Sequence, residues 1–356
     1  MSGKDLFLSA SRIKTARDCS WIYWCKYHLK LPDTTNSGAS MGWICHLIFE
    51  VLGNPRHKHH YETILKGKSI WSSKAVSRLV EYHARKLDVN EEEFLDQIND
   101  MTMVGLRYDF FGDTEEDPDE AISEEHFEIK VSEGDKRYNI RGFIDKLFFY
   151  SNGMKAIIRD FKTNKRVYKG KEITDNMQSL IYLLAVRRLY PEYVKRKMEF
   201  FFLRHGLEPD DFFKEKGSGY LAAEDMDDAE LGGLEYQLTT TQKYLESFTE
   251  EIAKSNYAFD QHKDGGGYPK DGTFGGRLMC GKDGPKIRKG EPLLDEAGEP
   301  IMAYICPFRK PRVYYVLLDE EGKILNSCDE GEQDSLEEGD GRTIEKREYA
   351  GCPRHL

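Results

Sequence analysis

Three charged side chains interrupt two apolar stretches near the middle of the chain. Asp145 lies inside the stretch 142–150, whereas Asp160 lies near the end of the stretch 156–161 and Lys162 follows two residues later. The Ser-Asn-Gly sequence between the stretches is typical of a β-hairpin turn, and strand alternation points Asp160 and Lys162 to the same side. Two carboxylates and an ammonium group at one sheet edge are costly without further compensation. The pattern predicts a divalent metal bound by oxygen ligands, and a structural Asp–Lys ion pair is the alternative.

A helix earlier in the chain adds two further candidate ligands. The sequence MGWICHLIFEVL at 41–52 has apolar residues at helical spacing, which predicts a helix. His46 and Glu50 are four residues apart and therefore share one of its faces. A histidine at such a position is either a metal ligand or an ordinary core or surface residue, and spacing alone does not decide between these interpretations.

A basic stretch follows directly after Lys162. This stretch contains four cations, Lys165, Arg166, Lys169 and Lys171. A run of charge is commonly a solvated face of a protein. Because this run begins beside the paired acids, contact with the phosphate backbone of a nucleic acid is the second interpretation.

The elements that must position these side chains predict a mixed α/β fold. Strands are predicted at 126–131, 137–150, 156–162 and 198–203. A helix is predicted between the last two strands, at about 174–190, with Thr174 or Asp175 as its cap. Gln178 and Tyr182 are one turn apart on this helix. The order strand, strand, strand, helix, strand predicts a mixed β-sheet with a crossover helix.

Length and composition exclude several classes of protein. With 356 residues, of which 39% are apolar, the chain can bury a large core. It has neither an apolar run of membrane-spanning length nor a signal-peptide core at its N-terminus, which predicts a cytoplasmic protein without a membrane partner. The net charge of −11 disfavours non-specific nucleic-acid binding over the whole surface but allows a local basic groove.

The expected domain organisation has two parts. Residues 1–256 should form the core, with a helical insertion at about 53–112. Residues 257–356 should form a glycine-rich C-terminal region, in which YYVLLDEEGKIL predicts a β-hairpin. We expect the acidic tail beyond Asp329 to be mobile.

The motifs occur in an order that resembles the RecB-like branch of the PD-(D/E)xK nuclease superfamily. In chain order they are Gly42-x3-His46-x3-Glu50, GFID ending at Asp145, DFK at 160–162 and Gln178-x3-Tyr182. The opening SASRIKTARDCSWIYWCKY also resembles the N-terminal pattern of that branch. The chain departs from the wider superfamily at two points. Its first acid lies in GFID instead of a Pro-Asp pair, and its second acid is Asp160, where the wider superfamily often has glutamate. The resemblance covers roughly residues 9–203 and implies a restriction-endonuclease-like mixed sheet flanked by helices.

The resemblance also implies an activity and roles for individual residues. It implies a metal-dependent DNA exonuclease of replication, recombination or repair, with Mg²⁺ or Mn²⁺ as the metal. The implied metal ligands are His46, Asp145 and Asp160. Lys162 would position or deprotonate the attacking water, and Gln178 and Tyr182 would bind the DNA backbone or orient Lys162. Glu50 is a candidate for indirect contact with the metal. A further acid could come from Glu124, Glu125 or Glu128, and the sequence does not choose.

DNA is the implied partner, together with a helicase or a recombination protein in a prokaryotic or phage-infected cell. The alternative is a catalytically silent member of the same fold that only binds DNA or a helicase. The presence of His46, Asp145, Asp160 and Lys162 argues against a silent module, because clustered buried acids give no advantage to a protein that only binds phosphate.

The seven cysteines argue for reduced thiols or a metal centre rather than for a disulfide framework. Several nucleases of the RecB-like branch hold a [4Fe–4S] cluster with one N-terminal cysteine and three C-terminal ones. For this chain the resemblance implies Cys19, Cys280, Cys306 and one other cysteine. The cysteines are widely spaced and no C-x2-C motif occurs. From the sequence we therefore expect ordinary thiols and a colourless protein.

Overall fold

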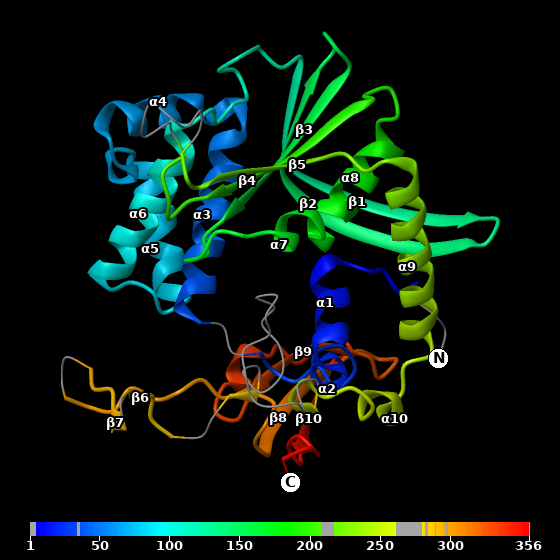
Figure 1. Ribbon diagram of the computed structural model, residues 1–356. Helices are drawn as coiled ribbons and strands as arrows, with labels where there is room; N and C mark the ends of the chain where they lie inside the picture. The colour runs from blue at the N-terminus through cyan, green and yellow to red at the C-terminus, as the bar shows by residue number, and fades with distance from the viewer. Residues whose placement is uncertain are drawn as a thin grey trace. The chain divides into compact units, whose positions relative to one another are not determined.

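The computed structural model describes residues 5–33, 36–207, 217–260, 280–281, 284–288, 290–295 and 298–355. Contacts divide the chain into two compact units (Figure 1). The first contains residues 1–10 and 35–243, and the second contains residues 11–34 and 244–356. Residues 11–34 thus group with the C-terminal part of the chain, whereas the boundary expected from the sequence placed them with the core. No helix in the described ranges is both long enough and apolar enough to cross a membrane.

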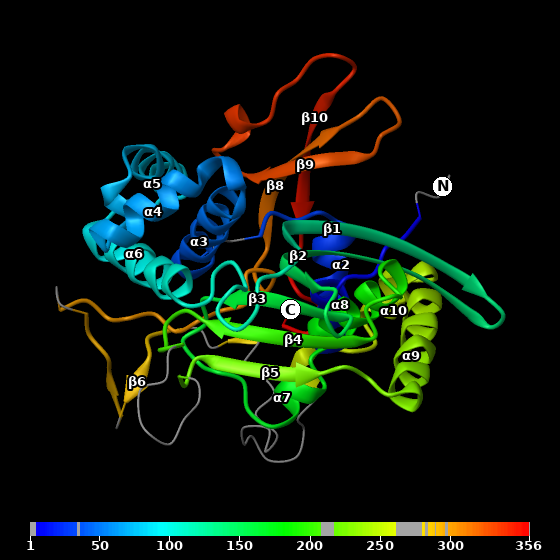
Figure 2. The ribbon, with the colours of Figure 1, turned by 90° about the horizontal axis from the view of Figure 1, so that it is seen from above.

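A five-stranded mixed sheet forms the centre of the first unit (Figure 2). Its strands are β1 (Glu120–Glu133), β2 (Lys136–Tyr150), β3 (Lys155–Lys162), β4 (Lys195–Phe202) and β5 (Tyr220–Glu224). They lie in chain order, with β3 and β4 parallel and the other neighbours antiparallel. Helix α8 (Met177–Leu189) lies between β3 and β4 in the chain and packs on β2, β3 and β4. The predicted mixed α/β fold class is confirmed, whereas β5 was not predicted.

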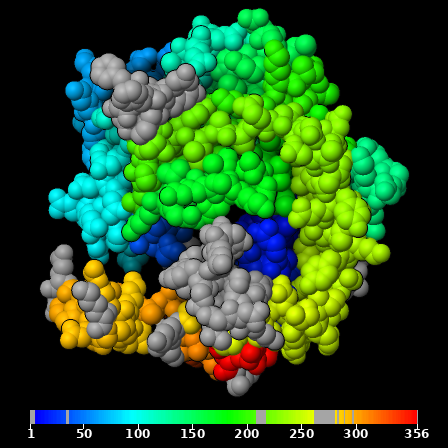
Figure 3. Space-filling model, viewed as in Figure 1, coloured from blue at the N-terminus to red at the C-terminus, as the bar shows by residue number. Residues whose placement is uncertain are grey.

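A group of helices covers one side of the sheet (Figure 1). In the space-filling view their atoms, blue to cyan, lie beside the green atoms of the central strands (Figure 3). Its members are α3 (Ser37–Gly53), η1 (Pro55–His57), α4 (Lys58–Gly67), η2 (Ile70–Ser72), α5 (Lys74–Lys86) and α6 (Glu92–Arg107). Their apolar residues form one core with Phe161 of β3 and Phe201 of β4. Because Phe161 faces this core, its neighbours Asp160 and Lys162 face the opposite side of the sheet, where α8 packs.

The start of α8 differs from the sequence-based expectation. Residues 171–174 form a separate short helix, α7 (Lys171–Thr174), so that neither Thr174 nor Asp175 is the cap. The cap is Asn176, whose side-chain oxygen accepts hydrogen bonds from the backbone N–H groups of Gln178 and Ser179. This places Gln178 in the first turn of α8. The first unit also contains most of α9 (Asp228–Glu246).

The second unit combines short helices with a small sheet. Its described elements include most of α1 (Ala10–Asp18), α2 (Ser20–Tyr27), α10 (Glu250–Ala253), η3 (Ala258–Asp260), β6 (Ile287–Arg288), β7 (Glu291–Pro292), β8 (Arg312–Leu318), β9 (Ile324–Asp329), η4 (Gln333–Ser335) and β10 (Thr343–Tyr349). Strands β8 and β9 are the predicted hairpin. The expectation of a mobile tail is wrong, because β10 pairs antiparallel with β8 and gives the order β10-β8-β9.

Lys146 is buried on the opposite face of β2 from its neighbour Asp145. Its side chain is 2% exposed, and its Nζ lies 3.8 Å from the centre of the Phe110 ring. Burial lowers the pKa of this lysine to about 7. A cation–π contact offsets only part of the lost hydration of the ammonium group. Protonated Lys146 therefore destabilises the folded state.

We expect Lys146→Met to stabilise the protein in a pH-dependent way. The folded pKa lies below the unfolded value of about 10.4, so the penalty is complete below pH 7 and disappears as the pH rises toward about 10. The substitution should raise the free energy of unfolding by about 1 to 4 kcal/mol at pH 6 and by less at about pH 9.5. Denaturant midpoints at both pH values measure this difference. The exposed control Lys165→Met should lack it, and equal stabilisation by Lys146→Met at both pH values would contradict the explanation.

Candidate active site

The two central acids lie where strands β2 and β3 separate. The hydrogen-bonded ladder between β2 and β3 ends at the pair Lys146 and Arg159, so Asp145 and Asp160 lie just beyond its end. Oδ2 of Asp145 accepts the backbone N–H of Phe161 at 2.7 Å, in place of a strand carbonyl. This hydrogen bond holds the carboxylate so that its other oxygen, Oδ1, faces helix α3.

His46 reaches the site from α3. Its Nδ1 lies 3.3 Å from Oδ1 of Asp145. The helix can approach the end of β3 because Gly42 has no side chain, since a Cβ there would lie 2.7 Å from Oγ1 of Thr163. Burial opposes protonation of His46, but the negative charges of Asp145, Asp160 and Glu124 together outweigh burial and raise the pKa of the imidazole to about 9. The site therefore has a surplus of negative charge that a metal cation could neutralise.

Glu124 joins these two residues from strand β1. The β1–β2 pairing is interrupted where Glu124 lies opposite Asp145, although the register is the same on both sides of the gap. Glu124 adopts a φ of 55° there, which is uncommon for a residue other than glycine. Ligand atoms of His46, Glu124 and Asp145 all lie within 4.8 Å of one another. Burial, followed by the charge of Asp145, raises the pKa of Glu124 to about 7.

Asp160 and Lys162 form a buried network with helix α8. Gln178 donates to Oδ1 of Asp160 at 2.7 Å, and Lys162 donates to Oε1 of Gln178 at 2.7 Å. Gln178 also donates to the Tyr182 hydroxyl at 2.9 Å. The Lys162 ammonium nitrogen lies 2.7 Å from Oδ2 of Asp160. Burial raises the pKa of Asp160, although the positive charge of Lys162 lowers it. The two carboxylate oxygens of Asp160 thus face different partners, Oδ1 the Gln178 amide and Oδ2 the Lys162 ammonium group.

The group of His46, Glu124 and Asp145 lines an open cavity of about 280 Å³. The other residues that line it are Trp43, Leu47, Glu50 and Phe143. The three candidate ligands are therefore accessible to a metal ion and to a substrate. Glu50 lies at the cavity but is not a member of the 4.8 Å group.

The residues singled out in the sequence fall into two groups. His46 and Asp145 meet at the cavity, whereas Asp160, Lys162, Gln178 and Tyr182 share the buried network. Asp160 lies outside the 4.8 Å group, so its role as a ligand stays a prediction. The four cations that follow Lys162 are all exposed, and one of them, Arg166, forms an ion pair with Glu172.

Glu124 is the functional candidate that sequence reasoning did not single out. Of the three acids considered, Glu125 instead accepts a hydrogen bond from the Tyr190 hydroxyl at 3.1 Å, and Glu128 is exposed. The choice depends on the interrupted pairing and positive φ at Glu124. An unusual φ at a glutamate has no signature in the local sequence, so no signal in the sequence could have identified Glu124.

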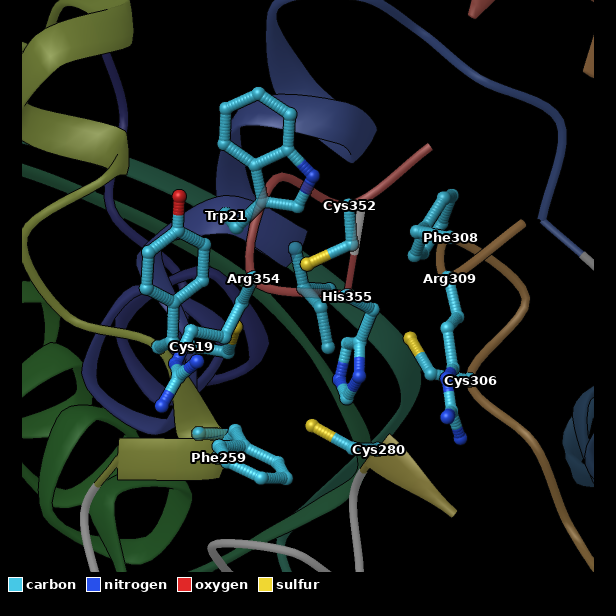
Figure 4. A pocket seen from close by; sticks show the side chains of 13 residues that line it. Cys19, Trp21, Phe259, Cys280, Cys306, Phe308, Arg309, Cys352, Arg354 and His355 are labelled. Atoms are coloured by element: carbon cyan, nitrogen blue, oxygen red, sulfur yellow. The ribbon is translucent and has the colours of Figure 1, made fainter. Parts of the chain in front are cut away.

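Four cysteines line one pocket in the second unit (Figure 4). They are Cys19, Cys280, Cys306 and Cys352. Cys19 precedes the first residue of α2 in an extended conformation, and the break between α1 and α2 occurs there. The backbone N–H of Cys306 donates to the carbonyl of Cys280 at 3.1 Å, and that of Cys352 donates to the carbonyl of Arg309 at 3.1 Å. Backbone pairing thus holds the three C-terminal cysteines around the pocket.

The mixed sheet places two acids and a lysine together where strands β2 and β3 separate. A sequence model of the PD-(D/E)XK nuclease superfamily matches residues 7–273. The chain belongs to this superfamily, which supports a hydrolytic nuclease, and nucleases of this superfamily typically use divalent metals.

Two solved structures show limited similarity to the chain. A candidate exonuclease from Eubacterium rectale is similar over 70% of this chain and 81% of its own, at 10% identity and a TM-score of 0.42. The protein SSO0001 is similar over 63% of this chain and 85% of its own, at 16% identity and a TM-score of 0.24. At these TM-scores neither similarity supports an argument about activity. No curated protein matches the chain.

Proposed function

We propose that the chain is a metal-dependent DNA exonuclease. The observation that carries this proposal is the placement of His46, Glu124 and Asp145 within 4.8 Å of one another, close to the buried pair of Asp160 and Lys162. Carboxylate oxygens with one imidazole suit Mg²⁺ or Mn²⁺, and the imidazole favours Mn²⁺. When bound, such an ion would supply Lewis acidity to the scissile phosphate.

The side chains of the site have separable roles in phosphodiester hydrolysis. The ammonium group of Lys162 would hold the attacking water and offset negative charge that develops on the phosphate. Asp160 and Gln178 fix the position of this ammonium group through contacts of 2.7 Å. Tyr182 contacts Gln178 and therefore acts as a positioning residue. Because the network is preformed and buried, little reorganisation accompanies the reaction.

The family resemblance also suggests a biological setting. We propose a role in DNA replication, recombination or repair in the cytoplasm of a prokaryotic or phage-infected cell, with a helicase or recombination protein as partner. A catalytically silent DNA-binding module is the alternative. The two functions differ in whether DNA is cleaved when metal is present.

Linear and circular DNA substrates test the proposed activity. End-labelled single-stranded and double-stranded DNA should be degraded from the ends in Mg²⁺ or Mn²⁺, and chelation of the metal should stop the reaction. Covalently closed circles should stay intact, because an exonuclease needs an end. Cleavage of circles would instead indicate an endonuclease. Binding without cleavage under all these conditions would favour the silent module.

The exposed basic stretch should account for part of the salt dependence of DNA binding. We expect Lys165→Ala combined with Arg166→Ala to weaken binding equally across sequences and to flatten the slope of log affinity against log salt by about one to two units. Titrations at several salt concentrations measure the slope. Removal of two exposed lysines of α4, by Lys58→Ala and Lys66→Ala, is the charge-matched control. An unchanged slope in the first variant would place the groove elsewhere, for example at Arg187 and Arg188.

We also propose that the four-cysteine pocket holds a [4Fe–4S] cluster, in place of the ordinary thiols expected from the sequence. Four thiolates are the usual ligand set of such a cluster. In the described ranges, no three cysteine sulfurs lie within 4.8 Å of one another. A single tetrahedral Zn²⁺ would bring its thiolates to about 3.8 Å from one another, so the wider spacing favours a larger centre. Burial raises the pKa of Cys306 to about 12, so that a bound centre must displace the proton of this thiol.

A further inference from the structure

Two large aromatic side chains lie exposed on the lining of the cavity that holds the candidate metal ligands. Trp43 is 49% exposed and precedes His46 by three residues on α3. Phe143 is 56% exposed and precedes Asp145 by two residues on β2. Core packing does not account for apolar surface of this size at a functional cavity, and such surface commonly marks a binding site.

A histidine packs against each of these rings. The centre of the Trp43 ring lies 4.9 Å from that of His83 on α5. The centre of the Phe143 ring lies 4.6 Å from that of His126 on β1, and the two planes are inclined by 31°. These contacts restrict the two aromatic rings before any ligand binds, so that less conformational entropy is lost on binding.

Different residues of the cavity suit the phosphate and the base of a nucleotide. A metal ion on His46, Glu124 and Asp145 would bind oxygens of the scissile phosphate. Glu50 also lines the cavity but lies outside this group, and its negative charge would repel any other phosphate that came near it. The base is the flat, polarisable part of a nucleotide and matches an exposed aromatic ring. We infer that Trp43 and Phe143 stack on unpaired bases next to the scissile phosphate.

This stacking identifies the substrate class as a single-stranded DNA end. In a duplex each base is covered by its neighbours in the stack, so its face is not available to a side chain. Stacking on aromatic side chains is the common way in which proteins bind single strands without sequence preference. The inference rests on the proposed nuclease function and adds strand preference to it.

Binding measurements without cleavage test the inference. The full chain is titrated in Ca²⁺ with a labelled oligothymidylate and with a blunt hairpin duplex. Trp43→Ala and Phe143→Ala should each weaken binding of the single strand about tenfold and change duplex binding less than about twofold. The salt slope should stay unchanged, because no phosphate contact is lost. Trp43→Phe should retain binding close to that of the unchanged protein.

The exposed aromatic residue Tyr236 provides a matched control, since it is 74% exposed on α9 and does not line the cavity. Tyr236→Ala should bind both ligands normally. Equal losses for single strand and duplex, or no loss in either cavity variant, would overturn the inference. A change of oligomeric state in these variants would also overturn it and make the surface a protein interface. If the chain binds single strands through Trp43 but never cleaves them, the nuclease proposal fails and the stacking inference stands.

Discussion

Lys162→Ala should reduce the rate of DNA cleavage about 10²- to 10⁴-fold. The Lys162 ammonium group lies 2.7 Å from both Asp160 and Gln178 and is held in one position by them. Its loss removes a positive charge that acts mainly on the transition state, so substrate binding should change little. Single-turnover cleavage of end-labelled DNA at saturating Mn²⁺ measures the effect. Asp160→Ala should abolish cleavage, because it removes both a candidate metal ligand and the anion that holds Lys162.

Two variants separate this role from metal binding and from folding. Asp145→Asn should abolish cleavage through loss of Mn²⁺ binding, which calorimetry detects, whereas Lys162→Ala should still bind the ion. Lys155→Ala removes a lysine from the opposite end of the same strand, where it pairs with Glu116, and should cleave normally. Near-normal cleavage by folded Lys162→Ala protein would disprove the proposed mechanism.

Cys352→Ser should remove the iron from the protein. Protein purified without oxygen should be brown, absorb broadly near about 400 nm and contain about four iron and four sulfide ions per chain. Loss of one of four thiolates should leave the variant colourless and lower its melting temperature, because a bound centre stabilises the fold that binds it. Cys19→Ser should behave in the same way, although the two cysteines lie at opposite ends of the chain.

Cys328→Ala is the matched control for the cluster. Cys328 is also buried in the second unit but packs against Leu317 and Leu336 and does not line the pocket. Its removal should cost some packing energy and leave the iron content unchanged. If the unchanged protein contains neither iron nor sulfide after anaerobic purification, the pocket holds ordinary thiols, as the sequence alone suggests.

Local rules were sufficient for the parts of the site that lie on single elements. Strand alternation predicted that Asp160 and Lys162 point to one side, and the observed ion pair agrees. Helical periodicity placed Gln178 and Tyr182 one turn apart, and these two side chains are hydrogen-bonded. Such rules work because the geometry within one strand or one helix repeats over a few residues.

Which residues from different elements meet depends on how the strands, helices and loops pack. Glu124 lies near His46 at a point where the β1–β2 pairing is interrupted and its φ is positive, and such a backbone conformation is set by the surrounding structure rather than by neighbours in sequence. Cys280, Cys306 and Cys352 share a pocket because backbone pairing brings distant loops together. Their wide spacing therefore argued against a shared site, whereas long-range pairing produced one. The chain by itself determined the fold class, the two central acids and the lysine, since these follow from local periodicity. The position of Glu124 beside His46 and Asp145 and the meeting of the four cysteines depend on contacts between residues far apart in the chain, which local periodicity does not encode.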